Sequence, residues 1–167
     1  MSHINKILVP MDGSPASIAA LAQAVTLAED VEASVEVLHV MAPDDFEVGS
    51  ATSASPAALE QAEREMEAAF GDAQRVLKDK LNRREVAGEP VRTILQIAAD
   101  EAVDLIVVGT HGRVGRMHAL FGSVAEGLVR NAPCPVLTVR RPESGEESFA
   151  ERIHGREALS EQARPPR

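Results

Sequence analysis

A spaced set of glycines in the second half of the chain is the strongest sign of chemistry in this sequence. Gly109 and Gly112 follow the apolar run 105–108, and Gly122-Ser123 open a second periodic segment. Glycines at a strand exit and at a helix entrance let backbone N–H groups face one point. The partial positive charge of a helix N-terminus favours an anion at such a point. The spacing therefore predicts a phosphate-binding loop between Gly109 and Ser123.

Two arginines and a histidine lie inside this loop. Arg113 and Arg116 carry guanidinium groups that suit phosphate oxygens or serve as plain surface charge, and His111 could donate to a phosphate or be solvated. Glycines also form ordinary turns, and Ser123-x-x-Glu126 matches a capping box, so turn chemistry would explain the same pattern. The chain has no G-x-x-x-x-G-K-[ST] run and no G-x-G-x-x-G run after a strand, which excludes a P-loop and a dinucleotide fingerprint.

A carboxylate stands at the end of the first apolar run. Asp12 lies just after the apolar run 4–9 and Pro10. There its carboxylate could accept a hydrogen bond from a ribose hydroxyl or an adenine amino group, or reach a metal through water. The alternative is an Asx turn or an N-cap for the next helix. Val40, at the end of the run 34–40, could line an adenine slot through its backbone or belong to the core.

Other kinds of site are not indicated. No pair among the five histidines has the H-x-x-x-H metal spacing with a Glu partner, and His39 is expected to be structural. Cys134 lies between two prolines before an apolar run, so we expect a packed, inert thiol. There is no G-x-S-x-G elbow and no Ser-His-Asp order, and Asp104 is expected at the opposite end of its strand from Asp12.

The apolar periodicity indicates how these residues are positioned. Strands and helices alternate, which predicts a parallel sheet covered by helices on both faces, with ligands at the carboxyl ends of the strands. That edge would bring Asp12, Val40 and the Gly109 loop together. The expected strands are 4–9, 34–40, 84–87, 104–108 and 135–139, and the expected helices are 14–29, 56–81, 90–98 and 123–130.

The composition narrows the class of protein. The 167 residues carry a formal net charge of −9, with 44% hydrophobic but only 2% aromatic residues and no Trp or Tyr. An acidic chain without base-stacking side chains is a poor binder of nucleic acid or anionic membrane. One cysteine excludes an intramolecular disulfide framework. The sequence has neither a signal-peptide pattern nor about 20 consecutive apolar residues, so we expect a cytoplasmic protein without direct membrane insertion.

The chain is expected to divide into two parts. Residues 1–141 form one α/β domain, interrupted by the polar loop 41–55, whose length is typical of functional or disordered segments. Residues 142–167 hold few large apolar residues and many glutamates and arginines. We expect this part to be an acidic tail that is disordered or partly helical.

Four sequence blocks together resemble the universal stress protein family over residues 4–140. They are KILVPMDGS at 6–14, VLHV at 37–40, DLIVVGTHGR at 104–113 and FGSVAEGLVRNAPCPVLTVR at 121–140. The resemblance implies a Rossmann-like, adenine nucleotide alpha hydrolase-like fold with a five-stranded parallel sheet of order 3-2-1-4-5. It also implies a homodimer through strand 135–139 or a tetramer, and it does not extend to the tail.

The resemblance further implies the ATP-binding branch of the family, because all glycines of that signature are present. The expected function is an ATP-binding sensor or regulator in stress response, with ATP as ligand and Mg²⁺ carried only by its phosphates. The alternatives are a slow ATPase, for which no general base is evident, or a module that binds an unidentified regulatory partner, such as a membrane transporter, without nucleotide. The residues predicted to bind ATP are Pro10, Met11, Asp12, Val40, Gly109, Thr110, His111, Gly112, Arg113, Gly122, Ser123 and Val124.

Overall fold

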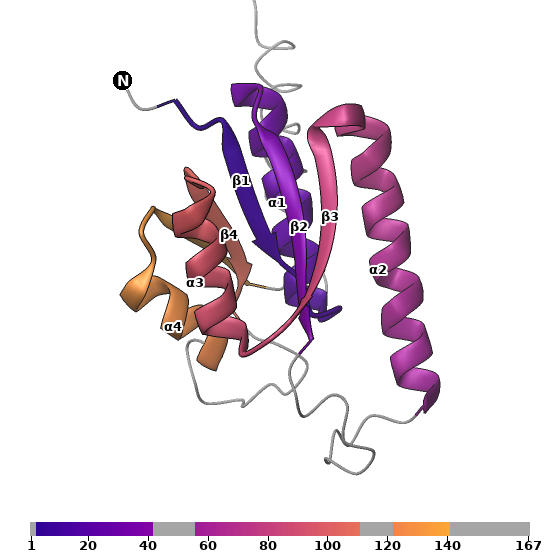
Figure 1. Ribbon diagram of the computed structural model, residues 1–167. Helices are drawn as coiled ribbons and strands as arrows, with labels where there is room; N and C mark the ends of the chain where they lie inside the picture. The colour runs from indigo at the N-terminus through magenta and orange to yellow at the C-terminus, as the bar shows by residue number, and fades with distance from the viewer. Residues whose placement is uncertain (1–2, 42–55, 111–121, 141–167) are drawn as a thin grey trace, which may run out of the picture.

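The computed structural model of the protein describes residues 3–41, 56–110 and 122–140 (Figure 1). The prediction for the tail 142–167 lies outside these residues, as does that for the loop 41–55 apart from Met41. Within the described ranges, no helix combines the length and apolar composition needed to cross a bilayer.

Strands and helices alternate along the chain in the predicted order. The strands are β1 (Lys6–Pro10), β2 (Ser34–Met41), β3 (Leu81–Ala87), β4 (Leu105–Gly109) and β5 (Val136–Val139). The helices are α1 (Pro15–Val31), α2 (Pro56–Leu77), α3 (Pro90–Asp100) and α4 (Ser123–Asn131), with a 3-10 turn at Lys78–Lys80.

The segment between α2 and β3 differs from the prediction. The helix was expected to continue to Leu81 and the strand to begin at Arg84, but the helix ends at Leu77 and Leu81 already belongs to β3. Lys78 has a φ of 53°, a left-handed conformation that a continuous helix cannot contain. Leu77 and Leu81 are both buried in the same cluster, so helical spacing and the helix-to-strand change give the same apolar pattern here.

The sheet is entirely parallel, with the order β3-β2-β1-β4-β5, which confirms the predicted topology. Helices α1 and α2 cover one face, and α3 and α4 cover the other (Figure 1). Successive residues of β1 point to opposite faces: Ile7 and Val9 join the cluster under α1, whereas Leu8 joins the one under α3 and α4. All three are fully buried, which explains why this strand is apolar throughout.

Four charged side chains form an ionic network near the amino ends of the strands. Glu36 is only 6% exposed and lies between Lys6 Nζ, at 2.9 Å, and Arg84 Nη2, at 2.6 Å. Glu101, at the end of α3, also pairs with Lys6 and lies 2.7 Å from Arg84 Nη2. Hydrogen bonds from Lys6 and Arg84 lower the pKa of Glu101. The two cations and two carboxylates compensate one another, as a buried charge requires.

Asp104 fixes the start of β4 to the start of β1. Its Oδ2 atom accepts hydrogen bonds from the backbone N–H groups of Asn5, at 2.8 Å, and Lys6, at 3.0 Å. These bonds stabilise the carboxylate form and lower the pKa of Asp104. As predicted, Asp104 is at the opposite edge of the sheet from Asp12.

This lowered pKa predicts a pH-dependent contribution to stability. A carboxylate whose pKa is lower in the folded state stabilises the fold above its unfolded pKa, about 3.9, and loses that effect as the pH falls through the folded value. The melting temperature of Asp104→Ala should therefore lie below that of the parent chain near neutral pH, and the gap should narrow at acidic pH. Thermal unfolding followed by circular dichroism over a pH series measures the gap, and a gap independent of pH would contradict this role.

Candidate functional site

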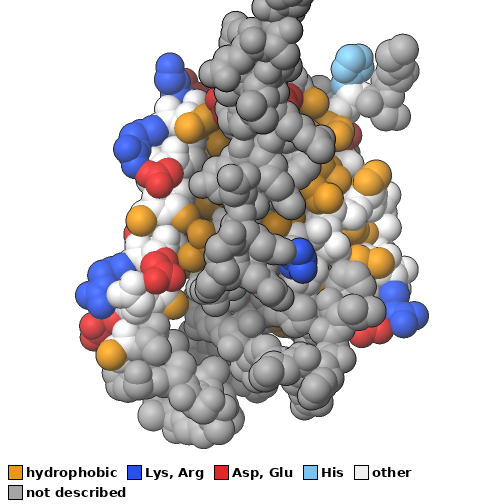
Figure 2. All heavy atoms as spheres, turned by 180° about the vertical axis from the view of Figure 1, so that it is seen from behind, with side chains coloured by type: hydrophobic (Ala, Val, Ile, Leu, Met, Phe, Trp, Pro, Cys, Tyr) orange, Lys and Arg blue, Asp and Glu red, His pale blue; other side chains and the backbone are white. Residues whose placement is uncertain are grey.

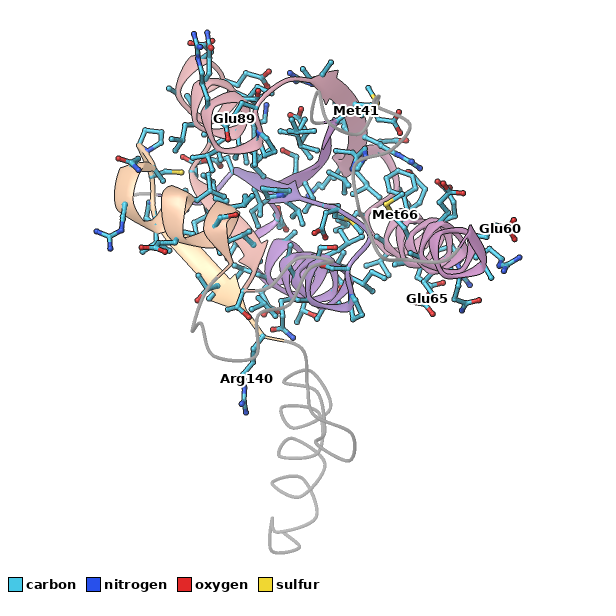
Figure 3. The ribbon with its side chains drawn as sticks, turned by 90° about the horizontal axis from the view of Figure 1, so that it is seen from below. Met41, Glu60, Glu65, Met66, Glu89 and Arg140 are labelled. Atoms are coloured by element: carbon cyan, nitrogen blue, oxygen red, sulfur yellow. The ribbon has the colours of Figure 1, made fainter. Side chains whose placement is uncertain are left out.

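The carboxyl edge of the sheet contains a topological switch point. The central strand β1 has β2 on one side and β4 on the other. The segment after β1 leads to α1 on one face, and the segment after β4 leads to α4 on the opposite face (Figures 1 and 3). Ligands of open parallel sheets bind in the crevice that such diverging connections leave. The predicted convergence is present, because Asp12 follows β1, Val40 lies near the end of β2, and Gly109 ends β4.

The turn between β1 and α1 is closed by its own side chains. Asp12 Oδ1 accepts from the backbone N–H of Ser14 at 2.9 Å, which is the Asx turn that the sequence offered as an alternative. Gly13 has a φ of 74°, a conformation that favours glycine. Ser14 is the N-cap of α1, and its Oγ accepts from Ser17 N at 3.2 Å. Asp12 is half-buried, and its carboxylate shapes the turn at the carboxyl edge of the sheet.

The N-terminus of α4 is organised differently. Its N-cap is Gly122, which has no side chain to cap the helix, and Ser123 is exposed at the first helical position. The capping box suggested by the sequence is not formed, because Ser123 is the first helical residue and not the N-cap. The Glu126 carboxylate instead accepts from Arg130 Nε at 3.1 Å, one turn later. The first-turn N–H groups of a helix have no partner within the helix. In α3, by contrast, Glu89 Oε1 and Oε2 cap Val91 N and Arg92 N.

The strand exit and the helix entrance are held together at the base of the predicted phosphate loop. The Gly122 N–H donates to the Thr110 carbonyl at 2.5 Å, and the Thr110 N–H donates to the Val139 carbonyl at 2.8 Å. These bonds fix both ends of the loop beside β5. The predicted contributors inside the loop, His111, Gly112, Arg113 and Arg116, lie outside the described residues.

Gly109 has a packing role that the sequence analysis did not anticipate. A Cβ atom at this position would lie 2.6 Å from the carbonyl carbon of Ala16 and 2.8 Å from the N atom of Ser17. Both are backbone atoms of the first turn of α1, which cannot move away without displacing the helix. The glycine is therefore required for close packing of α1 on β4, in addition to any role at a ligand.

The side chains of three further predicted site residues are buried or partly buried. Met11 is 3% exposed and belongs to the core cluster under α1, and Pro10 is buried too, so both can offer a ligand only backbone atoms. Val40 is half-buried on the opposite face, against the cluster under α3 and α4. It thus keeps both interpretations, an adenine contact and a core residue.

His39 supports the β1 turn from the neighbouring strand. Its Nδ1 atom lies 2.8 Å from the Met11 carbonyl oxygen. A carbonyl oxygen only accepts hydrogen bonds, so Nδ1 must carry a proton and neutral His39 has its lone pair on Nε2. This structural role agrees with the prediction for His39. Its bond to the residue before Asp12 could not be read from the sequence, because it depends on which side chains face each other across β1 and β2.

Two other expectations concern residues away from the crevice. Burial raises the pKa of the Cys134 thiol, and the nearby Asp104 carboxylate adds to the effect, which fits the expected inert thiol. Among the residues that the structure describes, no group of three or more His, Cys, Asp or Glu side chains is arranged to hold a metal ion.

A parallel sheet of this order, with helices on both faces and diverging connections at its switch point, defines a Rossmann-like α/β protein. Comparison with known proteins identifies the family within that class. The model of the universal stress protein family matches residues 3–140, so the chain belongs to this family.

Individual relatives agree with this assignment. Universal stress protein MJ0531 of Methanocaldococcus jannaschii is 32% identical over 140 residues, which cover 82% of each chain. The structure of UspA from Lactobacillus plantarum is 26% identical with a TM-score of 0.65, covering 84% of this chain and 100% of that one. A universal stress protein in complex with cAMP, 24% identical with a TM-score of 0.58, shares the fold and covers 84% of this chain and 100% of its own.

The packing of Gly109 predicts opposite effects for one substitution at two glycines. Gly109→Ala should lower the free energy of unfolding by about 1–3 kcal/mol, because the new methyl group overlaps α1 backbone. Gly71→Ala, within α2 and with no other heavy atom within 4 Å of the new Cβ, should raise it by about 0.5–1 kcal/mol through better helix propensity. Urea denaturation followed by circular dichroism measures both, and a neutral Gly109→Ala would disprove the packing constraint.

Proposed function

We propose that the protein binds an adenine nucleotide, with ATP as the main ligand, at the carboxyl edge of its sheet and acts as a nucleotide-dependent regulator. The observation that carries the proposal is the N-terminus of α4, whose N-cap Gly122 has no side chain and which lies at the same edge of the sheet as the Asp12 turn. Membership of the universal stress protein family supports it. A universal stress protein with this fold has been solved in complex with cAMP, so the fold itself is compatible with an adenine nucleotide.

The phosphates would lie against the first turn of α4. Backbone N–H groups of Ser123 and Val124 and the positive end of the helix dipole would neutralise part of their charge. The exposed Ser123 hydroxyl could add a hydrogen bond. Arg113 and His111, with the backbone at Gly112, are proposed to complete the phosphate contacts from within the loop. Mg²⁺, where present, would be held by the phosphates themselves.

The nucleoside would lie toward β1 and β2. Asp12 could accept a hydrogen bond from a ribose hydroxyl, since a carboxylate can accept several hydrogen bonds through its two oxygens. Val40, half-buried near the end of β2, would border the base, and backbone atoms at Pro10 and Met11 would read its edge. His39 would act indirectly, by holding the Met11 carbonyl and with it the turn that carries Asp12.

Titration with ATP tests this proposal. We expect micromolar affinity, weakened at least about tenfold by Asp12→Ala, the change that corresponds to losing about 1.4 kcal/mol of a charge-assisted hydrogen bond. Asp12→Asn keeps an oxygen that can accept from Ser14, so this variant should melt at the parent temperature. Because it loses the negative charge, it should also bind ATP weakly. Gly122→Val, which adds a branched side chain beside the phosphate position, should also bind weakly.

A substitution away from the carboxyl edge of the sheet serves as the control for the ATP titration. Asp79→Ala, at an exposed position in the turn after α2, should bind ATP like the parent chain. If the folded parent protein gives no binding heat with ATP, ADP, AMP or cAMP, the nucleotide proposal fails and a module that binds a partner protein without nucleotide is favoured. Steady phosphate release abolished by Asp12→Asn would instead favour the slow ATPase.

The two edge strands support the proposed homodimer through β5. Strand β3 carries Arg83, Arg84 and Glu85, charges that discourage edge pairing, whereas β5 has no charged residue and Leu137 is 41% exposed. The Pro135 carbonyl accepts from the N–H of Ile106 in β4, and the Val139 carbonyl accepts from the N–H of Thr110, the residue after β4. Along a strand, the backbone N–H and C=O groups of successive residues point alternately to one side and the other. Since those of Val139 point toward β4, the N–H of Thr138 points toward the open edge.

This alternation predicts a clean test of the dimer. Thr138→Pro removes the outward N–H without touching the bonds to β4, so it should convert a dimer to a monomer. Thr138→Val keeps the N–H and the side-chain shape and should remain dimeric. Sedimentation velocity distinguishes the two, and a folded Thr138→Pro dimer would place the interface elsewhere. A tetramer stays a prediction from the sequence.

A further inference from the structure

Strand β5 is held in the sheet more by backbone hydrogen bonds than by burial. Four of the five residues of β1 and of β4 are buried, whereas none of the four residues of β5 is. An edge strand with little buried surface opens locally at a low cost in free energy. The hydrogen bonds at its two ends therefore matter for the order of this edge.

Thr110 donates the bond at the carboxyl end of β5. At the start of the strand, the Ile106 N–H donates to the Pro135 carbonyl at 3.0 Å. At the end, the Thr110 N–H donates to the Val139 carbonyl at 2.8 Å. The last residue pair of β4 and β5 is Gly109 with Val139, so the Thr110 bond lies beyond the paired residues and closes the strand. Thr110 is only 7% exposed, which shields this bond from water.

The same residue is bonded to the first turn of α4. The Thr110 carbonyl accepts from the N–H of Gly122, the N-cap of α4, at 2.5 Å. The Gly122 carbonyl in turn accepts from the Glu126 N–H at 3.0 Å. An unbroken series of backbone hydrogen bonds thus runs from Val139 to the helix, and bonds in such a series strengthen one another. Thr110 therefore connects the order of β5 with the order of the α4 N-terminus.

A phosphate group at α4 would order this series from its other end. In the proposed site, the N–H groups of Ser123 and Val124 face the phosphates, directly after Gly122. Fixing this turn also fixes the Gly122 N–H, and with it the position of Thr110. The conformational entropy that the end of β5 loses on nucleotide binding is then not lost again when the edge pairs with another strand.

The edge ordered in this way is the one that suits a second copy of the chain. Strand β5 has no charged residue, and Leu137 is 41% exposed. The opposite edge is β3, which carries Arg83 and Glu85 and is flanked by α2, a helix strongly charged on its exposed side (Figure 2). The outward N–H of Thr138 lies between Leu137 and Val139, so the bond at Val139 helps to hold its direction.

We propose that binding of the nucleotide and pairing of β5 with a second copy stabilise each other through Thr110. This coupling, which rests on the function proposed above, makes assembly of the dimer the event that the nucleotide regulates. Coupling between two binding events is reciprocal, so each copy in the dimer should bind ATP more tightly than the monomer does. An affinity difference of about fivefold per copy is at the lower end of typical couplings. Because the dimer has two sites, saturating ATP then lowers its dissociation constant by the square of that factor, about 25-fold.

Sedimentation velocity of the nucleotide-free full chain, with and without saturating ATP, tests the coupling. The dimer dissociation constant should fall about 25-fold in the presence of ATP. ATP titrations of the parent chain at concentrations above and below that constant should differ about fivefold in affinity, with the dimer binding more tightly.

The contrary outcomes separate the coupling from the function on which it rests. If ATP binds and the dimer forms, but the dimer dissociation constant changes by less than about twofold, the coupling is overturned and the nucleotide site stands. A chain that binds ATP and stays monomeric at all concentrations overturns the coupling as well. Absence of ATP binding removes the proposed function itself.

Two substitutions at Gly122 test the route through Thr110 without any nucleotide. Gly122 has a φ of −71°, which proline adopts, so Gly122→Pro removes the N–H that donates to Thr110 at a compatible backbone angle. Gly122→Ala keeps this N–H and is the matched control. In dilute, monomeric protein, the amides of β5 should exchange hydrogen about fivefold faster in Gly122→Pro than in Gly122→Ala. Equal exchange in the two folded variants would overturn the route, and the sedimentation test on the parent chain holds whether or not Gly122→Pro folds.

Discussion

The close contact between Gly109 and the first turn of α1 is the constraint on which both the core and the carboxyl edge depend. It brings the backbone of Ala16 within reach of β4, and it fixes the distance between the turn after β1 and the exit from β4. Asp12 lies in that turn, and Thr110 begins that exit. A larger residue at Gly109 would separate them by displacing the helix, so the spacing of these two segments at the carboxyl edge depends directly on the packing of the fold.

The two edges of the sheet carry different kinds of polar interaction. At the amino edge, charged side chains satisfy each other: Glu36 is compensated by Lys6 and Arg84, and Asp104 accepts two backbone N–H groups. At the carboxyl edge, the described residues include backbone atoms at a glycine N-cap and in a glycine turn, beside the Asp12 carboxylate. Paired charges thus stabilise the amino edge, and the backbone N–H groups suited to an anion lie at the opposite one.

Much of the fold followed from the sequence because the central strands are apolar on both faces. The runs at β1 and β4, together with proline and glycine at the helix ends, placed most elements within a few residues and gave the strand order through the family resemblance. Strand β3 was harder, since an edge strand with exposed Arg83 and Glu85 lacks a continuous apolar run. The left-handed residue Lys78 then ended α2 where the leucine spacing alone favoured a longer helix.

The site was predictable at the level of strand ends and less so at the level of side chains. Topology alone brings Asp12 and Gly109 to one edge, but the sequence does not reveal that Met11 turns into the core. Nor does it reveal that Gly122 is the N-cap of α4, which makes Ser123 the first helical residue and prevents a capping box. The contributions of residues 111–116 and the cytoplasmic location stay predictions.

The scarcity of aromatic residues also determines the ultraviolet absorption and the fluorescence of this protein. With neither Trp nor Tyr and only four Phe, the polypeptide is almost transparent in the near ultraviolet. A purine ring absorbs strongly there, so a single retained nucleotide would dominate the absorption spectrum of a purified sample. For the same reason the chain has no intrinsic tryptophan fluorescence, and one tryptophan introduced at a chosen position would report that position against a dark background.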